Sequence, residues 1–331
     1  MSAQDTNAFK NMSETSHIEQ PEFSAIIACY YEEKSIDEFY TRLSGALNDL
    51  GRTYEIVFVN DGSTDKTFEK LKMIYDKDPH VTTIIDLFKN AGQAAAITAG
   101  IRHANGKNFV LLDSDLQLDP AELPLLVKEF DKGFDIVSGY RKNRKDSIFR
   151  IIPSKIANLI MRKVSESNFT DFGCTFKIIN GKLVRGFDFG PYKPLHPANL
   201  IARAQRCAEA PVTHHRRKYG ESGWTFKKLF AYNMDNIICL SQRPFQIIGV
   251  SCFFFALLFV FRIVLSVVFD FSVLTEITQG LLLNAVIISL LTIVSVLCLI
   301  GEFVIRNFVY LQKYPAYIIR EILRKPLDGG K

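Results

Sequence analysis

A short apolar run that ends in two carboxylates constrains the fold of this chain more than any other feature. Phe109-Val-Leu-Leu112 is typical of a buried strand, and Asp113 and Asp115 follow it one residue apart. In a parallel α/β sheet, ligands bind just beyond the carboxyl ends of the strands. Two close carboxylates disfavour each other's ionisation, so they favour a divalent cation, and their hard oxygens suit Mg²⁺ or Mn²⁺. We therefore expect Asp113 and Asp115 to bind a metal ion.

The alternative to a metal site is a cluster of helix-capping residues. Asp119 precedes Pro120, and this pair predicts a helix N-cap with proline at the first helical position. We assign that role to Asp119 alone. An EF-hand is a poor fit, because Leu118 stands where its loop needs glycine.

The first half of the chain alternates predicted strands with predicted helices. A helix is expected over residues 36–50, and five strands are expected over residues 24–29, 54–59, 81–85, 109–112 and 135–138. This alternation implies right-handed crossovers and a parallel sheet. The predicted fold class is therefore α/β, with a Rossmann-like parallel sheet.

Polar residues follow the ends of these strands and would converge on one edge of the sheet. They are Tyr30, Glu32, Asp61, Lys89, Asn90, Gln93, Asp113 and Asp115. The chain contains neither a GxGxxG nor a GxxxxGK[ST] motif, which argues against a dinucleotide dehydrogenase and a P-loop enzyme. A nucleotide is still the expected ligand, since acidic side chains suit ribose hydroxyls and base N–H groups.

Two long apolar stretches follow residue 240. Residues 246–269 contain one charge, Arg262, and residues 281–301 contain none. Each is long enough to cross a bilayer as a helix, although a buried helical hairpin is the alternative. The connector over residues 270–279 has no Lys or Arg, whereas the flanks are basic. The positive-inside rule therefore places both flanks, and with them the catalytic part and both termini, in the cytoplasm. The predicted protein crosses the inner membrane twice.

The remaining segments suggest no further chemistry. Residues 1–22 are polar, lack the apolar core of a signal peptide and are predicted to form a disordered tail. The six cysteines form no CxxC pair and are expected to act as small buried hydrophobes. The adjacent His214 and His215 have no partners at zinc-site spacing.

Four motifs at the predicted sheet edge resemble those of family 2 glycosyltransferases with a GT-A fold. They are Tyr30-Tyr31-Glu32, Asn60-Asp61-Gly62-Ser63, Asn90-Ala91-Gly92-Gln93 and Asp113-Ser114-Asp115-Leu116-Gln117. Three later segments are similar to the polyisoprenyl-phosphate glycosyltransferases: residues 141–147, 171–174 and 215–222. The resemblance covers residues 23–325. The chain departs from the family at Ala28, Tyr31, Lys177 and Gly223, where Pro, Asn, Arg and Lys are usual.

The resemblance implies roles for individual residues. The implied metal ligands, for Mg²⁺ or Mn²⁺, are Asp113, Asp115 and Gln117. The implied nucleotide-sugar contacts are Tyr30, Glu32, Asp61, Lys89, Gln93 and Asp113. The implied acceptor-phosphate contacts are Arg141, Arg144, Ser147 and Arg217. Asp115, Asp171 and Arg141 are the implied catalytic residues, with Asp171 as a base or an orienting carboxylate.

Two of these roles have structural alternatives. Residues 141–145 could be a solvated basic loop that faces acidic lipid headgroups. Asp171 could be a turn residue before Phe172 and Gly173.

The expected reaction is inverting, metal-dependent transfer of a single sugar from a UDP-sugar to undecaprenyl phosphate or another polyisoprenyl phosphate. It would occur at the cytosolic face of the membrane and serve cell-envelope glycan or lipid A modification. Membrane lipids are expected partners, nucleic acid is not, and the family implies a homo-oligomer, namely a tetramer. One rival is a processive polysaccharide synthase, but the only tryptophan, Trp224, follows Gly223 and so lacks the Gln-x-x-Arg-Trp motif. The other rival is a membrane scaffold that binds nucleotide without turnover.

The resulting domain plan has five parts. It comprises a disordered tail (1–22), a GT-A domain (23–223), an amphipathic juxtamembrane segment (224–243), two transmembrane helices (244–304) and a basic cytosolic tail (305–331). Basic, amphipathic helices over residues 151–164 and 224–240 are expected to lie in the lipid headgroup region, with ordinary core packing as the alternative.

Overall fold

The computed structural model describes residues 20–142, 162, 169–186, 200–219, 254, 257, 258, 261, 274–311 and 315–326. The chain forms two compact units. The first comprises residues 1–230 and 316–331, and the second comprises residues 231–315. Most of the predicted N-terminal tail, the amphipathic segment 224–240, all but Arg162 of the amphipathic segment 151–164, and most of the first apolar stretch lie outside the described residues.

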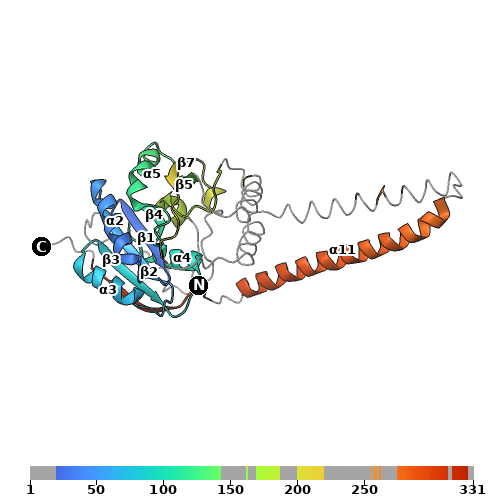
Figure 1. The fold of residues 1–331 in the computed structure, drawn as a ribbon, viewed down its shortest axis with the longest axis horizontal. Helices are drawn as coiled ribbons and strands as arrows, with labels where there is room; N and C mark the ends of the chain where they lie inside the picture. The colour runs from blue at the N-terminus through green and yellow to red at the C-terminus, as the bar shows by residue number, and fades with distance from the viewer. Residues whose placement is uncertain are drawn as a thin grey trace, which may run out of the picture. The chain divides into compact units, whose positions relative to one another are not determined.

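The first unit is built on one eight-stranded sheet in the order β7-β5-β6-β4-β1-β2-β3-β8 (Figure 1). All five predicted strands are present. They are β1 (Phe23–Cys29), β2 (Tyr54–Asn60), β3 (Val81–Leu87), β4 (Asn108–Asp113) and β5 (Ile136–Lys142). The first four pair in parallel, with Ile26 beside both Val57 and Leu111. These short apolar runs are buried on both faces, as parallel strands between helices must be.

The sheet is mixed, so the prediction of a wholly parallel sheet is wrong in this respect. Three strands were not predicted: β6 (Lys177–Asn180), β7 (Cys207–Thr213) and β8 (Ile319–Arg324). β6 lies between β4 and β5 and runs antiparallel to both. β8 pairs antiparallel with β3, and β7 pairs in parallel with β5. Residues 319–324 therefore form an edge strand within the segment that the sequence analysis assigned to a basic tail.

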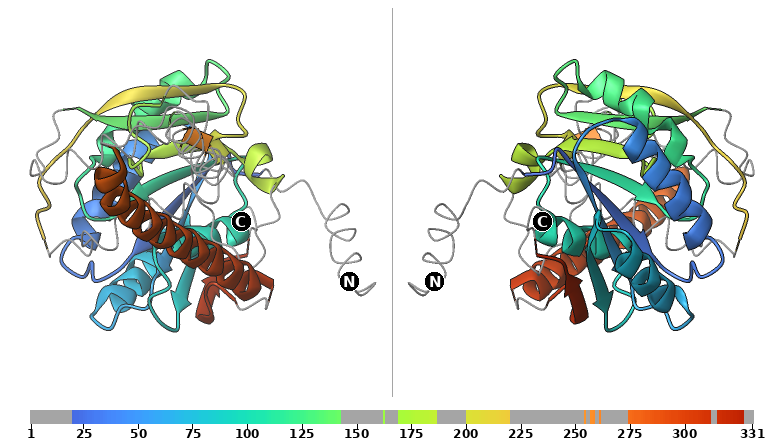
Figure 2. Two further views of the ribbon diagram at one scale, coloured as in Figure 1. Left: turned by 90° about the vertical axis from the view of Figure 1, so that its right-hand side faces the viewer. Right: turned by 90° about the vertical axis from the view of Figure 1, so that its left-hand side faces the viewer.

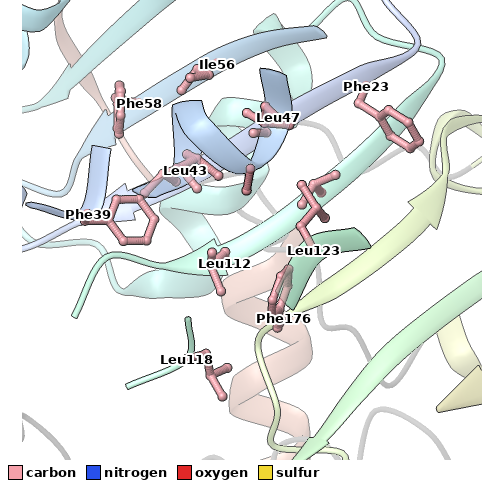
Figure 3. Packing of buried hydrophobic residues seen from close by; sticks show 14 of the residues in the cluster. Phe23, Phe39, Leu43, Leu47, Ile56, Phe58, Leu112, Leu118, Leu123 and Phe176 are labelled. Carbon is pink, nitrogen blue, oxygen red and sulfur yellow. The ribbon is translucent and has the colours of Figure 1, made fainter. Parts of the chain in front are cut away.

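Helices cover both faces of the sheet (Figure 2). They are α2 (Ile36–Asp49), α3 (Thr67–Lys77), α4 (Gln93–His103), η2 (Pro120–Glu122), α5 (Leu123–Phe130) and α7 (Gly181–Arg185). Side chains of α2, including Phe39, Leu43 and Leu47, pack with Phe58 and Leu112 of the sheet (Figure 3). The predicted helix over residues 36–50 is confirmed by α2, whose buried apolar residues recur at helical spacing.

The opposite face carries α4, whose small side chains allow it to lie close to the strands. Ala95, Ala96 and Ala99 pack with Val59 and Ile85. Asp61 directly follows β2, and Gln93 is the first residue of α4. The packing of α4 on the sheet therefore places both residues at the carboxyl edge of the sheet.

In the second unit, α11 (Leu274–Leu311) is one helix of 38 residues, and the structure describes only part of its side chains. Its described residues include strongly exposed apolar side chains, such as Leu283, Ile288 and Leu297. Taken over the fully described residues alone, no helix combines the length and the apolar character needed to cross a membrane.

Candidate active site

Asp113 ends β4 and is held on both of its carboxylate oxygens. The Gln93 side chain donates to Oδ1 from the start of α4, and the Thr175 hydroxyl donates to Oδ2 at 2.8 Å. Burial and the neighbouring charge of Asp115 raise the pKa of Asp113 to about 7, although both hydrogen bonds oppose the shift. Gln93 and Asp113, which were predicted to share a nucleotide-sugar site, are therefore in contact.

A tight turn brings Asp115 beside Asp113. Leu116 adopts a left-handed conformation with φ of 58°, and the Gln117 amide donates to Asp115 Oδ1 at 3.0 Å. The Gln117 carbonyl accepts from the His215 amide at 2.8 Å, which holds the segment after β7 against this turn. Asp119 accepts from the Ala121 amide at 3.0 Å, with Pro120 at the first position of η2. The predicted capping role of Asp119 is confirmed.

Arg217 is a positive charge close to two carboxylates, those of Glu32 and Asp115. Its guanidinium donates to Glu32 Oε1 at 2.9 Å and lies 3.9 Å from Asp115 Oδ2. Glu32 follows β1, is buried, and also accepts from the Ser35 hydroxyl. Burial raises the pKa of Glu32 even though Ser35 and Arg217 oppose the shift.

Asp61 follows β2 and braces the loop that leads into α4. It accepts from the Ala91 amide at 2.7 Å, the Gly92 amide at 3.0 Å and the Asn90 side chain at 3.0 Å. Burial raises the pKa of Asp61 to about 6, while the two backbone hydrogen bonds oppose the shift. The backbone of this loop approaches Gly62 so closely that a Cβ there would lie 2.3 Å from the Lys89 carbonyl carbon. Glycine is required for this approach and for its own φ of 68°.

Two aromatic side chains after β1 are exposed beside this cluster. Tyr30 is 44% exposed, and its ring packs edge-on against Tyr31 with centroids 4.6 Å apart. Tyr31 has a φ of 56°, and its amide donates to the Ser63 hydroxyl at 3.1 Å, next to Asp61 and Gly62. An exposed, oriented ring of this kind can stack on a base.

A second group of charges is formed by Arg141 on β5, Glu209 on β7 and Asp171, which precedes β6. Arg141 makes a two-pronged contact with Asp171, from Nε to Oδ2 and from NH2 to Oδ1, each at 2.7 Å. Glu209 of β7 accepts from the Asp171 amide at 3.0 Å and from the Thr170 amide at 2.9 Å. Burial works against ionisation of Asp171, but Arg141 holds its pKa below the ordinary value.

The segment from Asp171 to Lys177 joins the two groups of charges. Thr175 contacts Asp113, and four residues earlier Asp171 contacts Arg141. Lys177 is buried, and its ammonium group donates to the Cys174 carbonyl. This hydrogen bond holds the backbone of the segment in place. Burial lowers the pKa of Lys177. A Cβ at Gly173 would lie 3.0 Å from the Arg141 guanidinium, so a larger residue there would require the guanidinium to shift.

The structure thus brings most predicted residues to one sheet edge, while Arg144 and Ser147 lie outside the described residues. Thr175 and Glu209 contact the site and were not predicted. Thr175 follows the recognised motif at residues 171–174 by one position, so its hydroxyl could have been noticed. Glu209 lies on β7, for which the sequence pattern predicted no strand.

The two aspartates suit a divalent cation that a substrate would help to hold. Within the described ranges, no group of three or more His, Cys, Asp or Glu side chains is arranged to bind a metal. Mg²⁺ is commonly held by one or two carboxylates and completed by substrate phosphates, so Asp113 and Asp115 could serve as its protein ligands. Burial is the main cause of the raised pKa of Asp113, and the nearby charge of Asp115 adds to it, so a bound cation would favour the ionised form of Asp113.

Comparisons with known proteins give one family. The model of "Glycosyl transferase family 2" matches residues 24–189. A curated relative from Salmonella paratyphi A, undecaprenyl-phosphate 4-deoxy-4-formamido-L-arabinose transferase, is 36% identical over 231 residues, which span 68% of this chain and 69% of the relative. Among solved structures, glucosyl-3-phosphoglycerate synthase from Mycobacterium tuberculosis with Mn²⁺, UDP-glucose and phosphoglyceric acid has a TM-score of 0.49 at 15% identity. That match covers 66% of this chain and 79% of the synthase.

Proposed function

The chain belongs to glycosyl transferase family 2, and on that premise we propose that it transfers one sugar from a UDP-sugar to a polyisoprenyl phosphate. Undecaprenyl phosphate is the acceptor that we favour, because the Salmonella paratyphi A relative is named for it. The family model's match over residues 24–189 includes the motifs at residues 141–147 and 171–174, which resemble those of the polyisoprenyl-phosphate glycosyltransferases.

The observation that carries this proposal is the meeting of two charge groups at the end of β4. Glu32, Asp113 and Asp115 form an acidic group, in which burial, with a further contribution from the charge of Asp115, raises the pKa values of Glu32 and Asp113. Arg217 lies beside Glu32 and Asp115, and the segment from Asp171 to Thr175 connects Arg141 with Asp113 through its two end residues. An acidic group suits a metal-bound pyrophosphate, and a basic group suits the phosphate of an acceptor.

On the donor side, Tyr30, Glu32 and Asp61 would contact the nucleoside, with Lys89 and Gln93 near the pyrophosphate. Asp113 and Asp115, with Gln117, would hold Mg²⁺ or Mn²⁺. That cation would neutralise the charge of the departing UDP. Gln93 and Thr175 would keep the Asp113 carboxylate aimed at the same point through the contacts that they make with it.

On the acceptor side, an oxygen of the lipid phosphate would attack the anomeric carbon of the sugar. The new bond joins that oxygen to the carbon, and the bond from the carbon to UDP breaks on the opposite face, so the configuration inverts. A phosphate monoester with a second pKa near ~6 is mostly dianionic at neutral pH, so its attack requires positioning more than deprotonation. Arg141 and Arg217 would supply that positioning, with Arg144 and Ser147 as further contacts.

Asp171 then serves as an orienting carboxylate, which is one of the two roles predicted for it. Burial disfavours its ionised form, but the two-pronged contact with Arg141 outweighs burial and holds the pKa of Asp171 low. A carboxylate with a lowered pKa is a weak base, whereas the contact fixes the plane of the guanidinium. Glu209 supports the same geometry by anchoring the Asp171 backbone.

We further propose that residues 244–304 anchor the enzyme in the inner membrane as two helices, with the catalytic domain on the cytosolic side. Support comes from α11, which encloses the charge-free residues 281–301 and extends about 57 Å at 1.5 Å per residue. Leu283, Ile288 and Leu297 are among its exposed apolar side chains, and bilayer lipid would cover them. A membrane-impermeant thiol reagent should label a Ser272→Cys variant, but not the parent protein, in intact cells. Labelling only after lysis would contradict this topology.

The reaction is tested by incubating the purified full-length protein with a panel of UDP-sugars, Mg²⁺ and undecaprenyl phosphate, followed by lipid extraction. The panel includes the UDP derivative of 4-deoxy-4-formamido-L-arabinose. The proposal predicts one glycolipid that carries a single sugar. A polymeric product would favour the polysaccharide synthase, and UDP-sugar binding without any lipid product would favour the scaffold.

A further inference from the structure

The last strand of the chain contacts the loop that precedes α4. β8 begins at Ile319 and lies antiparallel to β3, with Leu87 opposite Ile319 and Asp86 opposite Glu321. One residue earlier, the Ile318 carbonyl accepts from the Phe88 amide at 3.0 Å. We call residues 88–92 the donor loop, because Lys89 lies in it and Gln93 follows it. The start of the donor loop is therefore paired with residues more than 200 positions away in the sequence.

Arg320 makes three contacts at this point. Its guanidinium donates to the Phe88 carbonyl at 2.7 Å and to Asp86 Oδ2 at 3.1 Å, and it lies over the Phe88 ring at 5.4 Å from the centroid. A flat guanidinium can make all three contacts at once, whereas an ammonium group cannot. Arg320 thus ties the first residue of the donor loop to the end of β3.

Asp86 needs the charge of Arg320. Its side chain is 1% exposed, and its other oxygen accepts from the Asn60 side chain at 2.7 Å. A buried carboxylate is costly unless it is paired, so Arg320 offsets a charge at the carboxyl end of the sheet. Asn60 is the last residue of β2 and immediately precedes Asp61, so the chain of contacts from Arg320 reaches the base of the predicted nucleotide site.

The far end of the donor loop is held by Asp61, which accepts from Asn90, Ala91 and Gly92. Gly62 packs against the middle of the loop at Lys89 and Asn90. Asp61 thus holds residues 90–92 of the donor loop, and Gly62 packs against Lys89 and Asn90. Arg320, which follows α11 in the sequence, holds the first residue of the loop, Phe88. This arrangement leaves Lys89 exposed at the centre of a loop whose backbone is held on both sides.

We propose that Arg320 is a positioning residue for the nucleotide donor, acting through the donor loop and through the Asp86–Asn60 contact. The inference rests on the proposed function, since it assigns the donor to this loop. It also gives the segment after α11 a part in donor binding, so the chain beyond the predicted membrane helices completes the nucleotide site.

The test is the affinity of the full-length protein for UDP with saturating Mg²⁺, measured by calorimetry. Replacing Arg320 with Ala removes two hydrogen bonds to the loop and to Asp86, so the dissociation constant should rise about tenfold. An Arg320→Lys variant should recover part of that loss, because a point charge can pair with Asp86 but cannot reproduce the fork.

Arg324→Ala is the matched control. Arg324 lies on the same strand and is also hydrogen-bonded, to Asn105 at 2.8 Å, but it pairs with Thr83 at the opposite end of β3. Its loss should change the UDP dissociation constant by less than about twofold. Equal affinities for wild type, Arg320→Ala and Arg324→Ala would overturn the inference. Absence of UDP binding by wild type would instead overturn the proposed function, and the inference with it.

A double variant, Asp86→Asn with Arg320→Ala, separates donor positioning from folding. Removing the buried charge at residue 86 should restore the melting temperature that Arg320→Ala lowers. The loop still lacks its bond to Arg320, so UDP affinity should remain reduced. If the double variant binds UDP as tightly as wild type, Arg320 acts only through stability and the proposed positioning role is wrong.

Discussion

The two halves of the site treat their carboxylates in opposite ways. The donor half comprises Glu32, Asp61, Asp113 and Asp115. Within it the pKa of Glu32 is raised, that of Asp61 is raised to about 6 and that of Asp113 to about 7. In the acceptor half, which comprises Arg141, Asp171 and Glu209, the pKa of Asp171 is lowered. Burial acts on both halves, so the difference is due to Arg141, which outweighs burial at Asp171.

This difference indicates what each half requires. The donor half contains Arg217, an expected contact of the acceptor phosphate, beside Glu32 and Asp115, yet the pKa values of Glu32 and Asp113 remain raised. It is therefore suited to accept a cation together with an anionic substrate. The acceptor half has its own cation, oriented before any ligand arrives, and needs only an anion. The predictions below test this division of charge, from the largest expected effect to the smallest.

The comparison fails if the donor half can lose a carboxylate without consequence. Replacing Asp115 with Asn should lower kcat about a hundred- to a thousandfold, because a group that neutralises leaving-group charge is lost. The measurement is glycolipid formation at saturating donor and acceptor. Asp119→Asn is the control: asparagine caps a helix as well as aspartate, and the exposed pair with Arg42 contributes little, so the rate should be unchanged. Wild-type turnover by Asp115→Asn would remove the metal assignment.

The acceptor half is tested by Arg141→Ala, which should raise the KM for the lipid phosphate about ten- to a hundredfold. Affinity for UDP should stay within about twofold of wild type, because Arg141 pairs with Asp171 of the acceptor half. Arg141→Lys should recover only part of the loss. If these residues merely attract anionic lipid, lysine would restore activity fully and the effect would fade at high salt. Equal losses of donor and acceptor binding would also contradict the division.

A pH titration distinguishes the halves within one protein. The ionised form of Asp113 binds the metal and donor, so UDP affinity at limiting Mg²⁺ should fall about tenfold per pH unit below about 7. The Thr175 hydroxyl lowers the pKa of Asp113, so Thr175→Val should move this transition to higher pH and Thr175→Ser should not. Asp171 should add no transition in the same range, because its pKa is lowered. A pH-independent UDP affinity would contradict the raised pKa of Asp113.

Stability should respond in opposite directions in the two halves. The folded protein binds a proton on Asp113 more tightly than the unfolded chain does, so stability falls as the pH rises from the ordinary pKa of 3.8 to about 7, and the full cost of ionised Asp113 applies above that. Asp113→Asn removes that cost, and a gain of about 1 kcal/mol would raise the melting temperature by roughly 2 to 4 °C.

Asp171→Asn should lower the melting temperature, since it leaves Arg141 without its buried carboxylate partner. Calorimetric scans at pH 8 compare both variants with wild type. Shifts of the same sign in the two variants would show that the halves do not differ in their charge balance.

Local patterns in the sequence were sufficient for the parallel core of the sheet. Buried strands such as β1 and β4 have unbroken apolar runs, α2 has helical spacing, and Asp119 with Pro120 has the composition of a helix start. The sheet-edge residues could be predicted together for the same reason, because parallel strands place their carboxyl ends at one edge. The motifs in residues 30–117 then indicated the family that the comparisons confirm.

Only the tertiary structure placed the groups that orient these residues. Thr175 reaches Asp113 across 62 positions, because β6 inserts antiparallel between β4 and β5. Arg320 reaches Asp86 across 234 positions, because β8 returns to the edge of β3. Strand insertion and edge pairing depend on which surfaces remain to be buried once the core has formed. The periodicity of a short segment does not indicate which distant segment will pair with it. Neither the Thr175–Asp113 contact nor the Arg320–Asp86 contact could therefore be predicted from local sequence.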